Sequence, residues 1–340
     1  MRCLSLAEVL QTRGVQTRFV CRKHEGNLIA MLQEKVMPVT VLSAPNRPSR
    51  ISGNDYAAWL GVSQAEDSEQ TIQALKGDQP DWLVVDHYGL DSDWERRLRP
   101  HVEKLLVIDD LANRQHDCDL LLDQNVLPGM DSGYQSLVPN HCRLLLGPRY
   151  AMLRPEFARV RASLRQRDGE LKCILVFFGG SDPTNETTKA LKGLFQLDRL
   201  DLIIDVVVGS SNPNKEQVRR LCNTLPNTTY HCQVDNMAEL MSKADVSIGA
   251  GGSASWERCC ICLPAIVTVL ADNQANIAAA LARTGALRNL GDAVRLNPSD
   301  YSAAVLSLTQ SDLRQMSRIA GTLVDGRGAQ RLVVELAGYP

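Results

Sequence analysis

The sequence has little net charge and no long hydrophobic run. Its 37 Lys and Arg residues and 39 Asp and Glu residues give a formal net charge of −2, and no long block carries a single sign. Nucleic-acid-binding proteins neutralise many phosphates with clustered basic residues, so we do not expect that role. The longest apolar stretch, residues 261–271, contains Pro264 and is much shorter than the ~18 residues that a membrane helix needs. No membrane contact is predicted.

The motifs of several enzyme classes are also missing. The chain has neither a G-x-x-x-x-G-K-[ST] sequence nor a well-placed G-x-G-x-x-G, which disfavours P-loop enzymes and dehydrogenases. No His, Asp or Glu cluster has metal-ligand spacing, and no serine nucleophile with a His partner is visible. We therefore expect neither a metal ion nor another cofactor.

The ten cysteines favour a reducing compartment. Met1 and Arg2 are followed by no apolar segment of a signal peptide, so we expect a cytoplasmic protein with free thiols. Cys259 and Cys262 have C-x-x-C spacing, but no second pair or nearby His completes a zinc site. Small buried hydrophobic side chains on one helix are the favoured interpretation.

The pattern of apolar segments predicts an α/β fold with two Rossmann-like domains. A length of 340 residues with 44% hydrophobic content suffices for two cores. Short β-branched runs alternate with helix-period segments, and runs such as LLVID, CILVFF and AIVTVL fit parallel strands covered on both faces. The expected strands are residues 16–21, 36–42, 82–86, 104–109, 120–122, 143–146, 172–178, 202–208, 229–232, 246–249 and 265–269.

A basic stretch at residues 155–167 predicts the domain boundary. We expect a first domain at residues 1–153, a solvated linker helix at 154–169 and a second domain at 170–340, whose last helix packs back on the first domain. A ligand would bind in a cleft between the domains, at the carboxyl ends of their strands.

The first domain opens directly in a helix. Its expected apolar face is formed by Cys3, Leu6, Ala7 and Leu10, and Gly14 is placed to end it. A doubly wound domain normally begins with a central strand, and no residues are present here to form one. We therefore expect the first domain to lack its first strand.

The strongest local motif is a glycine turn at residues 248–257. An apolar strand runs through Gly251, Gly252 and Ser253 into a helix, so backbone N–H groups could bind a diphosphate while Glu257 accepts from ribose hydroxyls. The alternative is a tight turn in which Ser253 caps the helix and Glu257 completes a capping box.

A second glycine turn contains Gly180 and Ser181. By itself it is also compatible with Asp182 or Thr184 simply capping the next helix. Two such turns in one half of the chain favour a nucleotide or a nucleotide-sugar diphosphate as ligand.

Polar residues follow three further strands. His87 and Tyr88 come after the strand WLVV and could exchange protons or hold a sugar hydroxyl. Asn273 and Gln274 follow AIVTVL, where they could hold a sugar or where Asn273 could cap a helix. For Asp109–Asp110 we favour ordinary loop chemistry at a strand end.

Several long motifs together resemble a known family. The chain is similar to the UDP-2,4-diacetamido-2,4,6-trideoxy-β-L-altropyranose hydrolases of pseudaminic acid biosynthesis, a step linked to flagellin glycosylation, which share the two-domain GT-B architecture. The motifs are MRCLSLAEVLQTRG, VVDHYGLD, VIDDLANR, LLLDQN, GPRYAMLRPEF, FFGGSDPTN, GAGGSASWERCCICLPAIVTVLADNQ and DGRGAQR.

The resemblance implies an enzyme with a UDP-sugar as its partner, and we expect a monomer. Water would attack the anomeric carbon and UDP would leave without a metal. Carried over by motif, the phosphate and ribose contacts are Gly180, Ser181, Gly251, Gly252, Ser253 and Glu257, and the sugar contacts are Tyr88, Asn273 and Gln274. A uracil site would lie near residues 233–237.

The chain departs from the family pattern at its start. In the family, a strand and a loop ending in Gly-His precede the helix that matches MRCLSLAEVL, and that His is the expected base. Here the match begins at Met1, so we expect a natural protein longer by about twenty residues. Within the given chain His87 is the candidate base. The alternatives are a degenerate nucleotide-sugar-binding protein and a GT-B glycosyltransferase.

Overall fold

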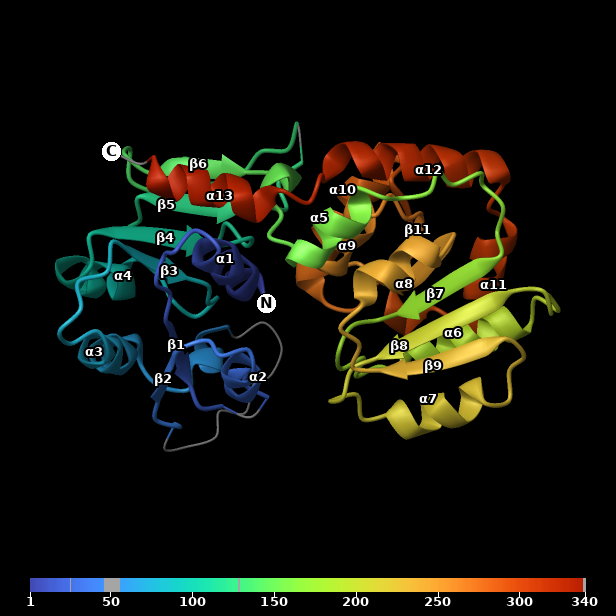
Figure 1. Ribbon diagram of the computed structural model, residues 1–340, viewed down its shortest axis with the longest axis horizontal. Coiled ribbons are helices and arrows are strands. Elements are labelled where there is room, and N and C mark those ends of the chain that lie inside the picture. Colours follow the sequence, from blue (N-terminus) through green and yellow to red (C-terminus); the bar gives the residue numbers. More distant parts are fainter. Residues whose placement is uncertain (25, 46–55, 128, 339–340) are drawn as a thin grey trace. The chain divides into compact units, whose positions relative to one another are not determined.

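The computed structural model describes residues 1–24, 26–45, 56–127 and 129–338, and it divides the chain into two compact units (Figure 1). Unit 1 consists of residues 1–152 together with 328–340, and unit 2 consists of residues 153–327. Across the described ranges, no helix has both the length and the apolar character that crossing a membrane requires.

Unit 1 contains two parallel sheets. One has the order β3-β4-β5-β6 and the other pairs β1 with β2. The strands are β1 (Phe19–Arg22), β2 (Val39–Leu42), β3 (Trp82–Val85), β4 (Lys104–Ile108), β5 (Leu120–Asp123) and β6 (Arg143–Leu146). The helices are α1 (Arg2–Gln11), α2 (Ile29–Glu34), α3 (Gln64–Ala74), α4 (Ser92–Leu98) and α13 (Gly328–Ala337), with short 3-10 turns η1 (Tyr56–Leu60), η2 (Arg99–His101) and η3 (Pro148–Tyr150).

Strands β4 and β5 are apolar on both faces because helices cover both. Leu106 and Leu120 pack in one cluster with residues of α1 and α13. Leu105 and Leu121 point the other way and pack with residues of α4. This two-sided burial explains why the two segments are nearly continuous apolar runs.

Helix α1 packs against both sheets of unit 1. Leu6 and Val9 belong to the cluster on β4 and β5, whereas Leu4 and Ala7 pack with the strands β1 and β2. The expected apolar face was therefore too narrow, since it omitted Leu4 and Val9, which are buried because the helix has a neighbour on two sides. Among the described strands, β1 pairs only with β2 and β3 only with β4; the expected missing strand stays a prediction.

Unit 2 has one six-stranded parallel sheet with the order β12-β11-β10-β7-β8-β9. The strands are β7 (Cys173–Phe177), β8 (Ile203–Val208), β9 (Thr228–Cys232), β10 (Val246–Ala250), β11 (Ala265–Val269) and β12 (Leu287–Asp292). The helices are α5 (Pro155–Arg161), α6 (Glu186–Phe195), α7 (Lys215–Cys222), α8 (Met237–Lys243), α9 (Ala254–Cys260), α10 (Asp272–Thr284), α11 (Pro298–Leu306) and α12 (Gln310–Leu323), with the 3-10 turn η4 (Ala293–Arg295).

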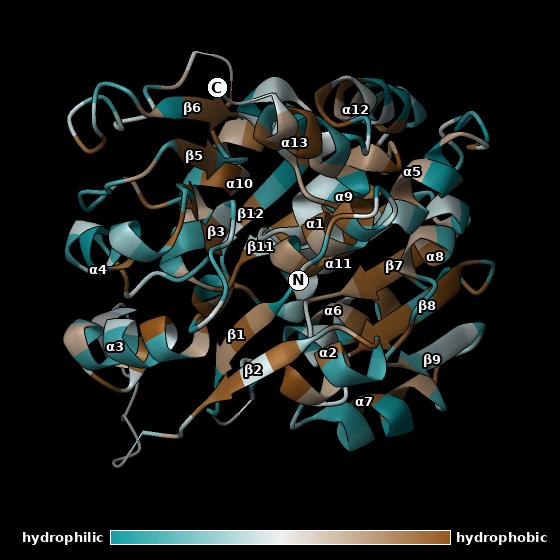
Figure 2. Cartoon of the chain, turned by 60° about the vertical axis from the view of Figure 1, so that its left-hand side comes forward, coloured by the Kyte–Doolittle hydropathy of each residue, from teal (hydrophilic) through white to brown (hydrophobic). Residues whose placement is uncertain are grey.

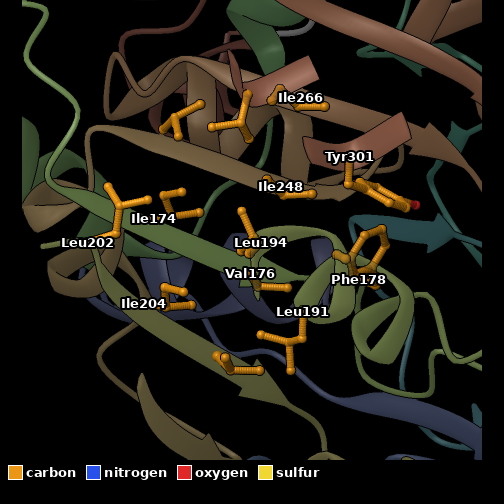
Figure 3. Packing of buried hydrophobic residues seen from close by; sticks show 14 of the residues in the cluster. Ile174, Val176, Phe178, Leu191, Leu194, Leu202, Ile204, Ile248, Ile266 and Tyr301 are labelled. Carbon is orange, nitrogen blue, oxygen red and sulfur yellow. The ribbon is translucent and has the colours of Figure 1, made fainter. Parts of the chain in front are cut away.

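The core of unit 2 forms on β7, β10 and β11. Ile174, Ile248 and Ile266 are completely buried and pack with Leu191 of α6 and Tyr301 of α11 (Figure 3). In Figure 2, β7 and β8 are mostly hydrophobic, whereas the helix α7 is largely hydrophilic. A strand lies at each of the eleven expected segments; β12 was missed because its sequence, LRNLGD, has no continuous apolar run.

The expectation of a solvated helix at residues 154–169 was wrong in its details. Helix α5 ends at Arg161, and Arg167 is only 6% exposed. The Arg167 guanidinium donates to the carbonyl groups of Met241, Ala244, Ile261 and Cys262 at 2.7–3.1 Å. These carbonyls lie where helices end, and the five donors of arginine satisfy them together.

Candidate functional site

In unit 1, charged and polar side chains gather where β3, β4 and β5 end. Asp86 follows β3, Asp110 follows β4, and Asp123 is the last residue of β5 with Asn125 just beyond it. The three strands are parallel neighbours, so their carboxyl ends lie at one edge of the sheet. We expected a ligand at the carboxyl ends of the strands, and in unit 1 this edge of the sheet carries several carboxylates.

Tyr88 belongs to this group through a direct bond to Asp110. The Tyr88 hydroxyl donates to Asp110 Oδ1 at 2.6 Å, and Arg2 and Asn125 each donate to Asp110 Oδ2 at 3.1 Å. Arg2 also donates to Asp86 Oδ1 at 2.6 Å. Burial and the Asp110 charge raise the pKa of Tyr88 above its usual value. With its proton directed at Asp110, the phenol oxygen is left to accept a hydrogen bond from a ligand.

The ring of Tyr88 lies in an aromatic cluster that the sequence did not predict. Its centroid is 5.0 Å from that of Tyr56 and 5.8 Å from that of Trp59. The Trp59 indole N–H is buried and has no partner among the described residues. The cluster thus offers apolar surface beside a charged network.

His87 is held by the turn that follows it. The Gly89 N–H donates to His87 Nδ1 at 3.0 Å, and burial lowers the pKa of His87. A neutral ring that accepts at Nδ1 carries its proton on Nε2. In this arrangement His87 is a hydrogen-bond donor toward a ligand and has no free lone pair with which to take a proton.

A second carboxylate pair lies beneath this edge. Tyr134 Oη lies 2.9 Å from Asp109 Oδ2 and 3.1 Å from Asp123 Oδ2. Burial, helped by the charge of Asp110, raises the pKa of Asp123 to about 7. Burial also opposes ionisation of Asp109, but the charge of Arg114 together with hydrogen bonds from Ala112 N and the Tyr134 hydroxyl outweighs it and lowers the pKa of Asp109. A protonated Asp123 can therefore donate to Tyr134, which donates in turn to an ionised Asp109.

We expect the Asp123→Asn variant to remove part of the pH dependence of stability. Because the folded pKa of Asp123 is about 7 and the unfolded value is ~3.9, the contribution of Asp123 to wild-type stability is lost as pH rises from ~4 to ~7. Asparagine is neutral in both states, so its stability relative to wild type should rise by about 2 kcal/mol between pH 5 and pH 7. Urea denaturation at several pH values measures this; parallel curves for the two proteins would contradict it, and exposed Asp131→Asn is the control.

In unit 2, the glycine turn after β10 has the predicted form. Gly251 donates its N–H to Thr268 O at 3.0 Å, and a Cβ on Gly252 would lie 3.4 Å from Gln274 Nε2. Gln274 Oε1 accepts from Leu270 N at 3.0 Å. The other amide atom of this side chain, Nε2, therefore points toward the glycine turn. The structure thus brings Gly252 and Gln274 together.

The capping interpretation of this turn is wrong. Ser253 occupies the N-cap of α9 but makes no side-chain cap bond, and it is exposed. Glu257 instead lies near Arg154, with Oε1 3.6 Å from the guanidinium, and burial raises the pKa of Glu257. The Ser255 hydroxyl is buried without a partner among the described residues. The side chains of Ser253 and Glu257 therefore do not cap α9.

The second glycine turn combines an exposed tip with a capped helix. Gly180 and Ser181 are exposed, whereas Asp182 is buried and accepts from Glu186 N and Thr187 N at 2.9 and 3.0 Å. The capping interpretation of Asp182 is thus confirmed. Asn273, on the first turn of α10, is exposed and does not cap it, since the N-cap is Ala271.

A buried arginine joins the two glycine turns. Arg258 Nη1 donates to Ala250 O at 2.8 Å and Nη2 to Phe177 O at 3.4 Å. These carbonyls belong to the last residues of β10 and β7, directly before the two turns. Burial lowers the pKa of Arg258 to about 10. The Arg258 side chain therefore holds the carboxyl ends of β10 and β7 in fixed positions relative to each other.

Comparison with known proteins identifies the fold. Residues 174–332 match the model of the glycosyltransferase family 28 C-terminal domain. The structure of MurG from Acinetobacter baumannii aligns with a TM-score of 0.67 and 15% identity over 99% of this chain and 95% of that one. UGT2 of Phytolacca americana, in a complex with UDP-2-fluoro-glucose and pterostilbene, aligns with a TM-score of 0.71 and 12% identity over 99% and 95%. The chain has the GT-B fold.

Three proteins are similar to this GT-B chain in sequence. The uncharacterised protein MJ1062 of Methanocaldococcus jannaschii is 28% identical over 61% of the chain, and the match covers only 44% of that protein. The spore coat polysaccharide biosynthesis protein SpsG of Bacillus subtilis is 28% identical over 80% of the chain and 81% of its own length. The UDP-2,4-diacetamido-2,4,6-trideoxy-β-L-altropyranose hydrolase of Campylobacter jejuni is 27% identical over 72% and 78%. The resemblance stated from the motifs is thereby confirmed.

The GT-B chain carries its candidate residues in both units. Tyr88 and His87 lie in unit 1, and the two glycine turns with Asn273 and Gln274 lie in unit 2. Within the described part of the chain, no group of three or more His, Cys, Asp or Glu side chains is placed to hold a metal ion. Sequence reasoning missed Arg2, Asp110 and Arg258, whose roles depend on partners distant in the chain.

Proposed function

We propose that the protein hydrolyses a UDP-linked diacetamido-trideoxy sugar at its anomeric carbon and releases UDP and the free sugar, as a step of pseudaminic acid biosynthesis. The observation that carries the nucleotide-sugar part is the pair of glycine turns tied together by Arg258. The hydrolytic part is supported by the similarity to the Campylobacter jejuni hydrolase.

Unit 2 would hold the nucleotide. The Ser253 side chain makes no cap bond to α9, and the backbone N–H groups of Gly252 and Ser253 would donate to the diphosphate, with Gln274 Nε2 beside Gly252. The Glu257 carboxylate would accept from ribose hydroxyls. Gly180 and Ser181, exposed on the second turn, would approach the phosphates. These neutral N–H donors would bind the phosphate oxygens, and the proposal includes no metal.

Unit 1 would hold the sugar and activate the water. We assign Tyr88 the acceptor role, since its own proton is directed at Asp110. As the attacking water bonds to the anomeric carbon, its proton would pass to Tyr88 while the Tyr88 proton passes to Asp110. The bond from the anomeric carbon to the phosphate oxygen would break and its electron pair would leave with UDP. His87 would donate from Nε2 to a sugar oxygen.

A phosphorus NMR time course tests the proposal directly. The purified chain is mixed with the predicted UDP-sugar, and free UDP should accumulate above the no-enzyme control while the substrate signals broaden. Broadened signals without UDP release would mean that the chain binds the nucleotide sugar and does not hydrolyse it. If neither signal changes, the assignment of a UDP-sugar ligand is wrong.

Glycosyl transfer is the second candidate, favoured by the match to a glycosyltransferase family 28 domain. A transferase would pass the sugar to an acceptor hydroxyl rather than to water. Proton NMR of the sugar product separates the two reactions, because hydrolysis yields the free reducing sugar and transfer yields a glycoside. UDP release that depends on an added acceptor would favour transfer.

A further inference from the structure

Two cysteines of unit 1 lie in direct contact at the edge of the sheet opposite the candidate site. Cys118 comes just before β5 and Cys142 just before β6, and their sulfur atoms are 3.5 Å apart. The two strands are parallel neighbours with Leu120 opposite Arg143, so their first residues start side by side. All ten cysteines of the chain are free thiols in this structure.

We propose that Cys118 and Cys142 form a reversible disulfide when the protein meets a peroxide. The observation that carries this is the contact itself, because bond formation needs the two sulfur atoms to approach from 3.5 Å to ~2.05 Å. Neither cysteine belongs to the residues to which we assign UDP-sugar hydrolysis. The inference therefore stands or falls independently of the proposed function.

The two thiols differ in exposure, which sets the order of the steps. Cys118 is completely buried in the cluster beneath α4, whereas Cys142 is partly exposed. The hydrogen bond with Cys142 and burial raise the pKa of Cys118, so it stays a thiol. Cys142 is therefore the sulfur that the oxidant reaches first.

The chemistry balances with hydrogen peroxide as the only co-reactant. The Cys142 sulfur takes one oxygen from the peroxide, whose O–O bond breaks, and becomes a sulfenic acid while one water is released. The Cys118 sulfur then displaces the sulfenic hydroxyl group. The Cys118 proton leaves with that hydroxyl as a second water, and the S–S bond forms. A dithiol returns both cysteines to thiols by exchange.

The cross-link would close the chain segment from Cys118 to Cys142. This segment contains β5 with Asp123 and also Tyr134, the hydroxyl of which joins the carboxylates of Asp109 and Asp123 beneath the site. A disulfide restricts the unfolded chain, so the oxidised protein should melt at a temperature roughly 5 °C higher than the reduced one. The rise should disappear after treatment with dithiothreitol.

Peptide mapping gives the decisive readout. Trypsin should release both cysteines in one peptide, residues 115–143, because no Lys or Arg lies between Arg114 and Arg143. After peroxide treatment and alkylation, that peptide should carry no alkyl group and be about 2 Da lighter than the unalkylated reduced form. Further cleavage after Tyr134 should yield two peptides joined until reduction.

Three variants make the test specific. Cys142→Ser should abolish the cross-link and the rise in melting temperature, and because Cys142 is partly exposed this variant keeps the core intact. Cys118→Ala should leave Cys142 as a sulfenic acid that a cyclic diketone probe can trap. Cys232→Ser, which removes an exposed thiol of unit 2, should change neither result.

The proposal is overturned if the peptide of residues 115–143 keeps two alkylatable thiols at peroxide doses that oxidise Cys232. It is equally overturned if Cys142 accumulates as a sulfinic acid while Cys118 remains a thiol. In that case the two sulfur atoms do not meet on the time scale of oxidation.

Discussion

Replacing Gly249 by alanine is expected to lower the free energy of unfolding by about 3–4 kcal/mol. Gly249 lies in β10, and a Cβ there would be 2.0 Å from the Phe177 carbonyl oxygen and 2.5 Å from Arg258 Nη2. Neither neighbour can move freely, because the carbonyl belongs to the paired strand β7 and the guanidinium is buried. The two strands must separate to accommodate the methyl group.

The same substitution should also weaken UDP binding. Separation of β10 from β7 displaces the two strand ends that Arg258 holds, and with them both glycine turns. Urea denaturation followed by circular dichroism measures the stability, and calorimetry with UDP measures the affinity. Gly180→Ala is the control for stability, since a Cβ there has no atom within 4 Å. Equal stability of Gly249→Ala and Gly180→Ala would contradict the prediction.

Replacing Tyr88 by phenylalanine is expected to reduce kcat for UDP-sugar hydrolysis about 10²–10³-fold. The substitution removes the oxygen that accepts the water proton and keeps the ring among Tyr56 and Trp59, so KM should change little. Asp110→Asn should have an effect of similar size, because asparagine cannot take the proton that Tyr88 gives up.

The double variant distinguishes a relay from two separate contributions. If Tyr88 and Asp110 act as a unit, the double variant Tyr88→Phe with Asp110→Asn should have a kcat within a few-fold of that of each single variant. Tyr230→Phe, on β9 of unit 2, is the matched control and should keep the wild-type kcat. If the fold losses in kcat of the two single variants multiply in the double variant, or if only KM changes, the two residues only bind the sugar.

The strands and the glycine turns could be predicted because their determinants are local. A buried parallel strand needs an apolar run, and a close backbone approach needs glycine, so CILVFF and the turn at Gly251 and Gly252 are visible in the sequence. Strand β12 was missed for the same reason, because its residues are half-buried and include Gly291, Arg288 and Asn289.

The polar parts of the site depend on partners that lie far away in the sequence. Asp110 was interpreted as ordinary loop chemistry, yet its partners Tyr88 and Arg2 are 22 and 108 positions away. Arg167 was interpreted as solvated, although four carbonyls from two distant segments surround its guanidinium. Such bonds follow from the fold, and no pattern of residue types along the chain indicates them.

Because of its position, helix α1 links ligand binding at the candidate site to the stability of unit 1. The helix packs on both sheets with its apolar side chains, and its first residue, Arg2, bonds Asp86 and Asp110 at the candidate site. A ligand that binds only when this network is formed stabilises the docked helix by RT ln(1 + [L]/Kd), which is about 2.7 kcal/mol at a hundredfold excess over Kd. Amide hydrogen exchange in α1 would then slow in proportion to saturation, so the helix would report on binding.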